Sequence, residues 1–318
     1  MKHPSMAAAL LAPAVIAGLG LGAGAAHART GAPAARAAWV KTCSSKKSPI
    51  DHPCGGWRLI MRDGRQVVVR GAAGTEDSAF AISADGRVMA YERAGDHRLV
   101  VQPVAGGPAR PLPKAVGGGS VSLMLSPTGD KVSIDRAYSS RGGPAKVVTV
   151  ATGHVATLPR GDIVLGFSGD GDEVLTQRVL SDNTTRLAAH ALAGGSVKRT
   201  PPQVIAGAVA FALAADGHTV AAFSWGDADR KRPPRVRTYD LRTGELSASA
   251  GLPLESDTEV HAAWWDAGGR LHASVRRGGG GETTVVRVLT VDPESGRVTQ
   301  NDRYSVSKSA YASVTAGE

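Results

Sequence analysis

The residues with the clearest capacity for recognition chemistry are arginines and lysines that gather in short, polar segments of this sequence. Guanidinium and ammonium groups held on one surface attract anionic partners. We expect a binding rim whose members are Lys46, Lys47, Arg136, Arg141, Arg230, Lys231, Arg232, Arg235, Arg276 and Arg277. The competing interpretation is a set of ordinary solvated loops. It is favoured by nearby acidic residues, namely Asp135, Asp227, Asp229 and Glu282.

Side chains suited to catalysis do not form a recognisable motif. The sequence has no Gly-x-Ser-x-Gly nucleophile elbow. Asp170-Gly171-Asp172-Glu173 resembles a fragment of a calcium loop, but the twelve-residue ligand series of an EF-hand is missing. Five histidines occur without metal-ligand spacing: His154, His190, His218, His261 and His272. We therefore predict no catalytic residue, no metal site and no cofactor, and favour a non-enzymatic protein over an enzyme.

The start of the chain has the features of a secretory signal peptide. Lys2 precedes an apolar stretch over residues 6–24, and Ala26-His27-Ala28 is a small-residue cleavage site. We expect residues 1–28 to be removed and residues 29–36 to form a disordered leader. No later segment is apolar for long enough to span a bilayer. The mature protein is thus expected to be secreted or retained at the cell envelope, without a membrane span.

Two cysteines, Cys43 and Cys54, lie in the part of the chain that would be exported. An oxidising compartment makes a disulfide between them the expected state. A redox-active pair would have Cys-x-x-Cys spacing, and a zinc site would need more ligands than the neighbouring His52. The bond would close a loop of about a dozen residues and stabilise the fold by on the order of 3 kcal/mol.

A repeated unit must position these residues, and it is clearest over residues 80–91. There an apolar run meets the turn Ala84-Asp85-Gly86 and a second apolar run follows. Asp bonds the backbone two residues on and Gly tolerates a positive φ, so the unit is a β-hairpin. The turn glycine returns with spacings of 43, 42, 46 and 52 residues, at Gly129, Gly171, Gly217 and Gly269. A period in the forties with two hairpins per unit is typical of a propeller blade.

The second hairpin of the unit occurs six times, whereas the first occurs five times. Residues 37–70 supply only three strands of a blade, and residues 309–314 form an unpaired alternating stretch at the other end of the chain. We predict that this stretch is the missing innermost strand. The fold class is then an all-β propeller of six four-stranded blades, one domain over residues 37–318, closed by the C-terminal strand. A five-bladed ring with a loose N-terminal hairpin is the alternative.

The repeated turns also resemble those of a known group. An apolar strand followed by Ser-x-Asp-Gly, as in residues 82–91, and a Thr-Gly turn, as in residues 239–245, resemble TolB-like and WD40-like propeller repeats. The resemblance covers about residues 57–305, and its motifs are structural. The resemblance therefore implies a propeller fold, but it identifies no functional residue. TolB itself carries an additional N-terminal domain for which this chain has no room, so its envelope role is not carried over.

The composition narrows the class of partner. The net charge is +9, but aromatic residues make up only 4% of the chain, too few for base-stacking platforms, so no nucleic-acid partner is expected. We predict a monomeric scaffold that binds a protein or an anionic cell-envelope partner through its loop faces. The alternative is a propeller enzyme of lyase or lactonase type with a site at the channel mouth. Acidic residues and a histidine fall near the starts of inner strands there: Asp162, Asp257, Glu259 and His261.

Overall fold

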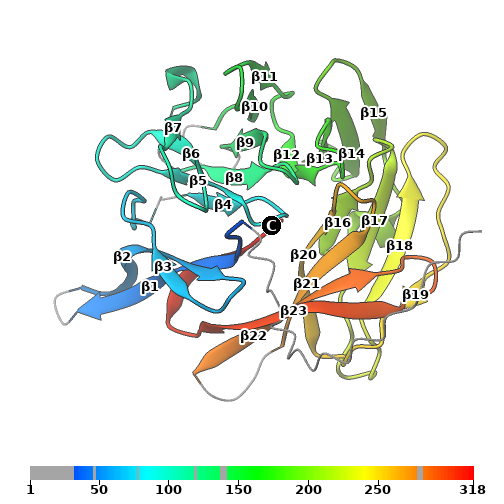
Figure 1. Ribbon diagram of the computed structural model, residues 1–318. Helices are drawn as coiled ribbons and strands as arrows, with labels where there is room; N and C mark the ends of the chain where they lie inside the picture. The colour runs from blue at the N-terminus through cyan, green and yellow to red at the C-terminus, as the bar shows by residue number, and fades with distance from the viewer. Residues whose placement is uncertain (1–31, 46–47, 77–78, 118–119, 137–141, 278–281) are drawn as a thin grey trace, which may run out of the picture. The chain divides into compact units, whose positions relative to one another are not determined.

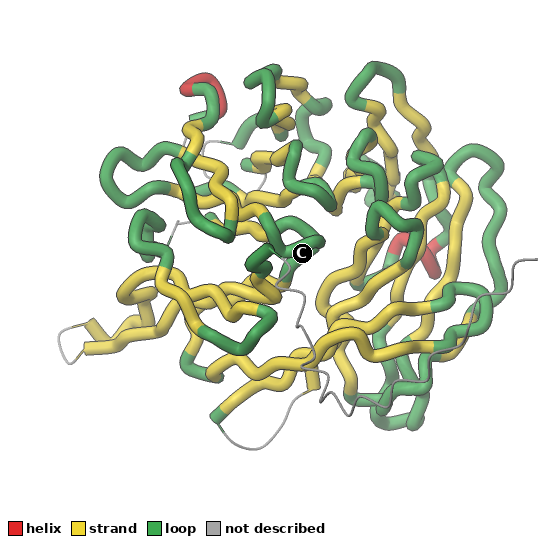
Figure 2. Tube along the Cα trace, in the orientation of Figure 1, coloured by secondary structure: helices red, strands yellow, loops and turns green. Residues whose placement is uncertain are grey.

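The fold is a six-bladed β-propeller, seen in the computed structural model as six four-stranded antiparallel sheets among the described residues (Figures 1 and 2). The structure describes residues 32–45, 48–76, 79–117, 120–136, 142–277 and 282–318. The expected signal peptide lies outside these residues, as do Lys46, Lys47 and Arg141 of the expected rim. The prediction of six blades is confirmed.

The four strands of each blade are named A to D from the channel outward. They are consecutive in the chain in every blade but the first, whose strand A comes from the C-terminal end. Blade 1 consists of β24 (Ala310–Thr315), β1 (Ala35–Ser45), β2 (Ser48–Met61) and β3 (Gln66–Val68). Blade 2 consists of β4 (Phe80–Ile82), β5 (Val88–Glu92), β6 (Leu99–Pro103) and β7 (Arg110–Pro111). Blade 3 consists of β8 (Ser122–Leu125), β9 (Lys131–Asp135), β10 (Lys146–Thr149) and β11 (Val155–Thr157).

The other three blades follow the same order along the chain. Blade 4 consists of β12 (Ile163–Phe167), β13 (Glu173–Val179), β14 (Thr185–Ala191) and β15 (Ser196–Arg199). Blade 5 consists of β16 (Ala210–Leu213), β17 (Thr219–Ser224), β18 (Arg235–Asp240) and β19 (Ala250–Gly251). Blade 6 consists of β20 (Thr258–Trp265), β21 (Leu271–Arg277), β22 (Thr283–Val291) and β23 (Val298–Ser307). Short helices η1 (Lys114–Val116) and α1 (Gln203–Ala206) lie in two of the connections between blades.

The repeated Ser-x-Asp-Gly phrase builds the turn between strands A and B. In blade 2 the buried Ser83 hydroxyl donates to Asp85 at 2.6 Å and accepts from the Val88 amide at 3.0 Å. Gly86 then takes the positive φ of 77° that the turn requires. Blade 4 repeats the arrangement with Ser168 and Asp170, whose side chains are 2.7 Å apart. The Asp-Gly pairs are therefore turn chemistry, as the sequence indicates.

The two ends of the described chain close the ring in one sheet. β24 pairs antiparallel with β1, with Ala37 opposite Thr315 and Val40 opposite Ala312. Figure 1 shows this red C-terminal strand beside blue β1. The predicted closing strand is thus confirmed. The sheet begins earlier than expected, because β1 starts at Ala35, whose amide donates to the carbonyl of Gly86 at 2.8 Å.

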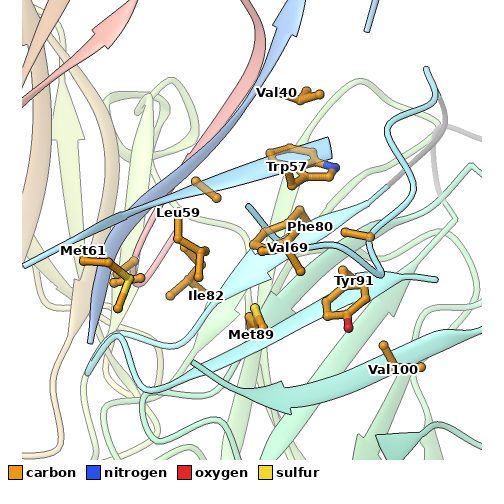
Figure 3. Close-up of a cluster of buried hydrophobic side chains, with 14 residues drawn as sticks. Val40, Trp57, Leu59, Met61, Val69, Phe80, Ile82, Met89, Tyr91 and Val100 are labelled. Atoms are coloured by element: carbon orange, nitrogen blue, oxygen red, sulfur yellow. The ribbon is translucent and has the colours of Figure 1, made fainter. Parts of the chain in front are cut away.

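Apolar side chains form six buried clusters among the described residues, one between each pair of consecutive blades. Between blades 1 and 2, the ring of Phe80 stacks on those of Trp57 and Tyr91, with centroids 4.6 and 5.9 Å apart (Figure 3). The cluster between blades 6 and 1 has only five buried members among the described residues. Burial of these faces is the main stabilising contribution to such a fold.

The alternation of strands gives the propeller two different faces. The A–B and C–D turns lie on one, which we call the turn face. The B–C loops and the connections between blades lie on the other, which we call the loop face. The disulfide Cys43–Cys54 joins β1 and β2 in the B–C hairpin of blade 1, confirming the predicted bond. It therefore lies on the loop face.

Candidate functional site

The described rim residues of blades 3 and 6 are held in interactions within the protein. The Arg136 guanidinium donates to the carbonyl of Val116 at 2.9 Å and so ties blade 3 to the preceding connection. Arg277 forms ion pairs with Glu255 and Asp257. A guanidinium committed to internal partners has less to offer a ligand. These positions therefore support the architecture of the loop face more than recognition.

The B–C loop of blade 5 differs from the others. Its residues 225–235, which we call the basic hairpin loop, carry four of the expected rim residues. Arg230 pairs with Asp227 at 2.9 Å. Among the described residues, the side chains of Lys231, Arg232 and Arg235 have no ion pair, and all three residues are exposed. Three cations without an ion pair thus share this one loop of the loop face.

Trp225, which the sequence reasoning missed, stands at the base of the basic hairpin loop. It directly follows β17 and is 66% exposed, the largest exposed fraction among the large hydrophobic residues described. An indole ring left in solvent beside unpaired cations is a frequent feature of binding surfaces. The available signal was a tryptophan immediately before a basic run, at the point where a strand ends.

The basic hairpin loop is a built structure. Asp227 and Arg232 exchange two backbone hydrogen bonds of 2.8 and 2.9 Å, which extends the β17–β18 hairpin toward its tip. Gly226 packs so closely on the connection between blades 5 and 6 that a Cβ there would lie 2.3 Å from the Ser256 carbonyl oxygen. Lys231 adopts a positive φ of 52°, a backbone conformation that is strained for residues other than glycine. The loop therefore presents its cations in a fixed shape.

The central cavity holds a second polar group. Its volume is about 260 Å³, and inner strands β8, β12, β16 and β20 line it with mainly apolar side chains. His261 Nε2 lies 2.7 Å from Glu318 Oε1 in this cavity, and an Arg276 nitrogen lies 3.9 Å from the same carboxylate. Burial raises the pKa of Glu318, but the His261 hydrogen bond and the nearby positive charges outweigh it and lower the pKa below its usual value.

Of the four residues expected at the channel mouth, only His261 lines the cavity. Asp162 is buried inside blade 4, where its carboxylate accepts from Arg178 Nε at 2.5 Å and faces His190 Nε2 at 2.9 Å. Asp257 pairs with Arg277, and Glu259 is exposed. Asp162 is therefore not part of the channel-mouth site that the enzymatic alternative would need. Asp162 directly precedes strand A of this blade, and its contacts with strands B and C were not visible because the partners lie 16 and 28 residues away.

The buried network in blade 4 leads to a pH-dependent prediction. Burial lowers the pKa of His190, and the Asp162 carboxylate offsets this only in part. Between its lowered pKa and the unfolded value of about 6.5, the unfolded chain binds more protons at this site. The contribution of this network to the free energy of unfolding is therefore fully present above about pH 6.5 and is lost as the pH falls through the folded pKa of His190. Urea unfolding between about pH 7.5 and 5.5 should show this decline.

The matched variants His190→Gln and His154→Gln isolate this effect, since His154 is exposed. The first should be less stable at neutral pH and should lose part of the pH dependence. The second should keep the full wild-type slope. Equal slopes in all three proteins would contradict the role given to His190.

A cleft of about 750 Å³ opens on the turn face and is lined by residues of blades 1, 2, 3 and 6. Two pairs of charged groups meet in it: Arg36 with Asp302 at 2.9 Å across blades 1 and 6, and Asp266 with Arg270 at 2.7 Å within blade 6. Arg62 and Arg87 also line the cleft and have no ion pair among the described residues. Burial raises the pKa of Asp266, but hydrogen bonds from Arg270 and His272 outweigh it and hold the pKa at about 2. The Arg36–Asp302 pair joins the last blade to the first and so supports ring closure.

In the described part of the chain, no three His, Cys, Asp or Glu residues are grouped as a metal ion would require. No helix of the described residues is both long and apolar enough to cross a membrane.

Comparison with solved structures places the fold. TolB from Acinetobacter baumannii aligns with 89% of this chain and 67% of its own, at 14% identity and a TM-score of 0.53. The fold is that of a TolB-like propeller. The resemblance seen in the turns is thereby confirmed for the architecture. At this identity the likeness concerns the fold alone.

Two further structures resemble the TolB-like propeller less closely. A putative TolB from Agrobacterium tumefaciens shares 13% identity over 86% of this chain and 90% of that one, with a TM-score of 0.48. The β-propeller domain of the trilobed protease from Pyrococcus furiosus shares 13% over 85% and 79%, with a TM-score of 0.45. By sequence, no family model matches the chain, and no curated protein shows significant similarity to it.

Proposed function

We propose that this TolB-like propeller is an exported, non-enzymatic scaffold that binds a protein or another cell-envelope component through its loop face. The observation that carries the proposal is the exposed Trp225 beside the unpaired cations of the basic hairpin loop. The disulfide on the same face is compatible with an oxidising, extracytoplasmic location. Removal of residues 1–28 on export is part of the proposal.

Co-sedimentation of the purified protein with cell-envelope fractions tests this function. Trp225→Ala removes the exposed ring, and we expect the bound fraction to fall at least about fivefold, as for loss of an interface anchor. Val68→Ala is the matched control, because Val68 is also exposed but lies on β3, the outer strand of blade 1. Equal binding by the wild type and Trp225→Ala would contradict the loop face as the binding surface.

Among the described residues that line the central cavity, the enzymatic alternative has one candidate group, the His261–Glu318 pair. A histidine held by a carboxylate has the geometry of a general base. The scaffold proposal predicts that His261→Ala leaves envelope binding unchanged. If His261→Ala instead abolished a turnover measured with the wild type, the enzymatic function would replace the scaffold.

A further inference from the structure

We propose that the basic hairpin loop docks this protein on an anionic membrane surface, with Trp225 seated among the lipid headgroups. The inference rests on the proposed function. It uses the same loop face and names the class of envelope component that the face binds.

The charge of the loop matches a phosphate-rich surface. Lys231, Arg232 and Arg235 carry no ion pair among the described residues, whereas Arg230 pairs with Asp227. With the exposed Asp229 counted, the loop keeps a net charge of +2 (four cations and two carboxylates). Cations close together near an anionic bilayer are attracted to it additively over about one Debye length. Their long aliphatic stems also allow the chain to approach the headgroups while the charged ends remain hydrated.

Trp225 supplies the apolar part of the contact. Its ring is amphipathic and favours the headgroup level of a bilayer over either water or hydrocarbon. Two more exposed apolar side chains extend from other connections of the loop face: Val179 at the end of β13 and Val204 in α1, 59% and 47% exposed. Single apolar residues on separate loops favour shallow insertion at several points. A protein partner would favour one contiguous buried patch.

The fixed shape of the loop supports docking as well. The Asp227–Arg232 backbone pairing projects residues 228–231 beyond Trp225, so the exposed Lys231 is carried at a turn outside the strands. A loop already held in its binding geometry loses little conformational entropy when it binds. The positive φ of Lys231 is consistent with a functional role for this side chain, because glycine would adopt that turn conformation without strain.

Vesicle sedimentation tests the proposal with pure lipids. We expect the protein to bind vesicles of phosphatidylcholine with roughly one third phosphatidylglycerol, and not vesicles of phosphatidylcholine alone. Binding should fall about tenfold or more in Lys231→Gln/Arg232→Gln/Arg235→Gln and on raising the salt concentration. The matched control is Arg62→Gln/Arg87→Gln/Arg242→Gln, which removes the same charge from exposed positions on the turn face and should bind as the wild type does.

Tryptophan fluorescence gives a second readout. Anionic vesicles should shift the emission of the wild type to shorter wavelength, and Trp225→Phe should abolish the shift. Equal vesicle binding by the two charge variants would overturn the proposal. So would binding to a poly-glutamate peptide without binding to vesicles, which would identify an acidic protein segment as the partner. Loss of envelope binding in Trp225→Ala without vesicle binding would retain the proposed function and reject only this inference.

Discussion

Deleting residues 308–318 is expected to abolish the stable monomer, because it removes the strand that closes the ring. β24 contributes five residue pairs with β1 and buries Thr315, which accepts a hydrogen bond from the Tyr304 hydroxyl. At about 1 kcal/mol for each hydrogen bond, the loss is comparable to the total stability of about 5–15 kcal/mol of a typical domain. The exposed edge of β1 would also promote aggregation. Thermal melting with light scattering measures both effects.

The control for this truncation is Val68→Ala on the opposite, solvent-exposed edge of the same blade, which should melt as the wild type does. A synthetic peptide of residues 308–318 added during refolding should restore part of the monomer, since the strand can pair in trans. A truncated protein that stays monomeric with an unshifted melting temperature would show that the ring does not depend on β24.

Gly86→Val is expected to destabilise the fold more than the same change at Gly217. Both glycines have a positive φ, 77° and 71°, which strains a β-branched residue. At Gly86 the new Cβ would also lie 2.2 Å from the Ala35 carbonyl oxygen of the neighbouring blade. At Gly217 it would meet the side chain of Glu173 at 3.0 Å, which can move aside. We expect costs of about 4 kcal/mol or more and about 2 kcal/mol, respectively.

Gly95→Val is the matched control for the two turn variants, because Gly95 has no positive φ and its Cβ would have no atom within 4 Å. Its unfolding free energy should stay within about 0.5 kcal/mol of the wild type. Chemical denaturation measures the free energy of unfolding of the three variants and so ranks their costs. A cost at Gly95 equal to that at Gly86 would show that neither the turn geometry nor the Ala35 contact decides the effect.

The fold could be predicted because the turns repeat. The A–B turn of each of blades 2 to 6 has a Gly at a positive φ and a Ser or Asp that bonds the turn, and both recur at a regular spacing. Closure was predictable from the unequal hairpin counts. The residue at which β1 begins could not be predicted. The Ala35 amide donates a hydrogen bond to the Gly86 carbonyl of another blade, and a single sequence does not show such a contact.

The candidate site was predictable only in part. Basic residues on loops of one face followed from the strand alternation. Which of them are unpaired depended on partners distant in sequence, such as Glu255 for Arg277 and Val116 for Arg136. The exposure of Trp225 depends on how the hairpin loop leaves β17, and the alternation of apolar residues along the strand gives no sign of it.

Site-specific photo-cross-linking in the producing cells tests the central claim, that the loop face is the binding surface, most directly. A photoreactive phenylalanine derivative at position 225 should form adducts with an envelope component. The same residue at the exposed position 68 of the outer strand should form few or none. Adducts at position 68 equal to those at position 225, or none at position 225 in a folded, exported protein, would contradict the account.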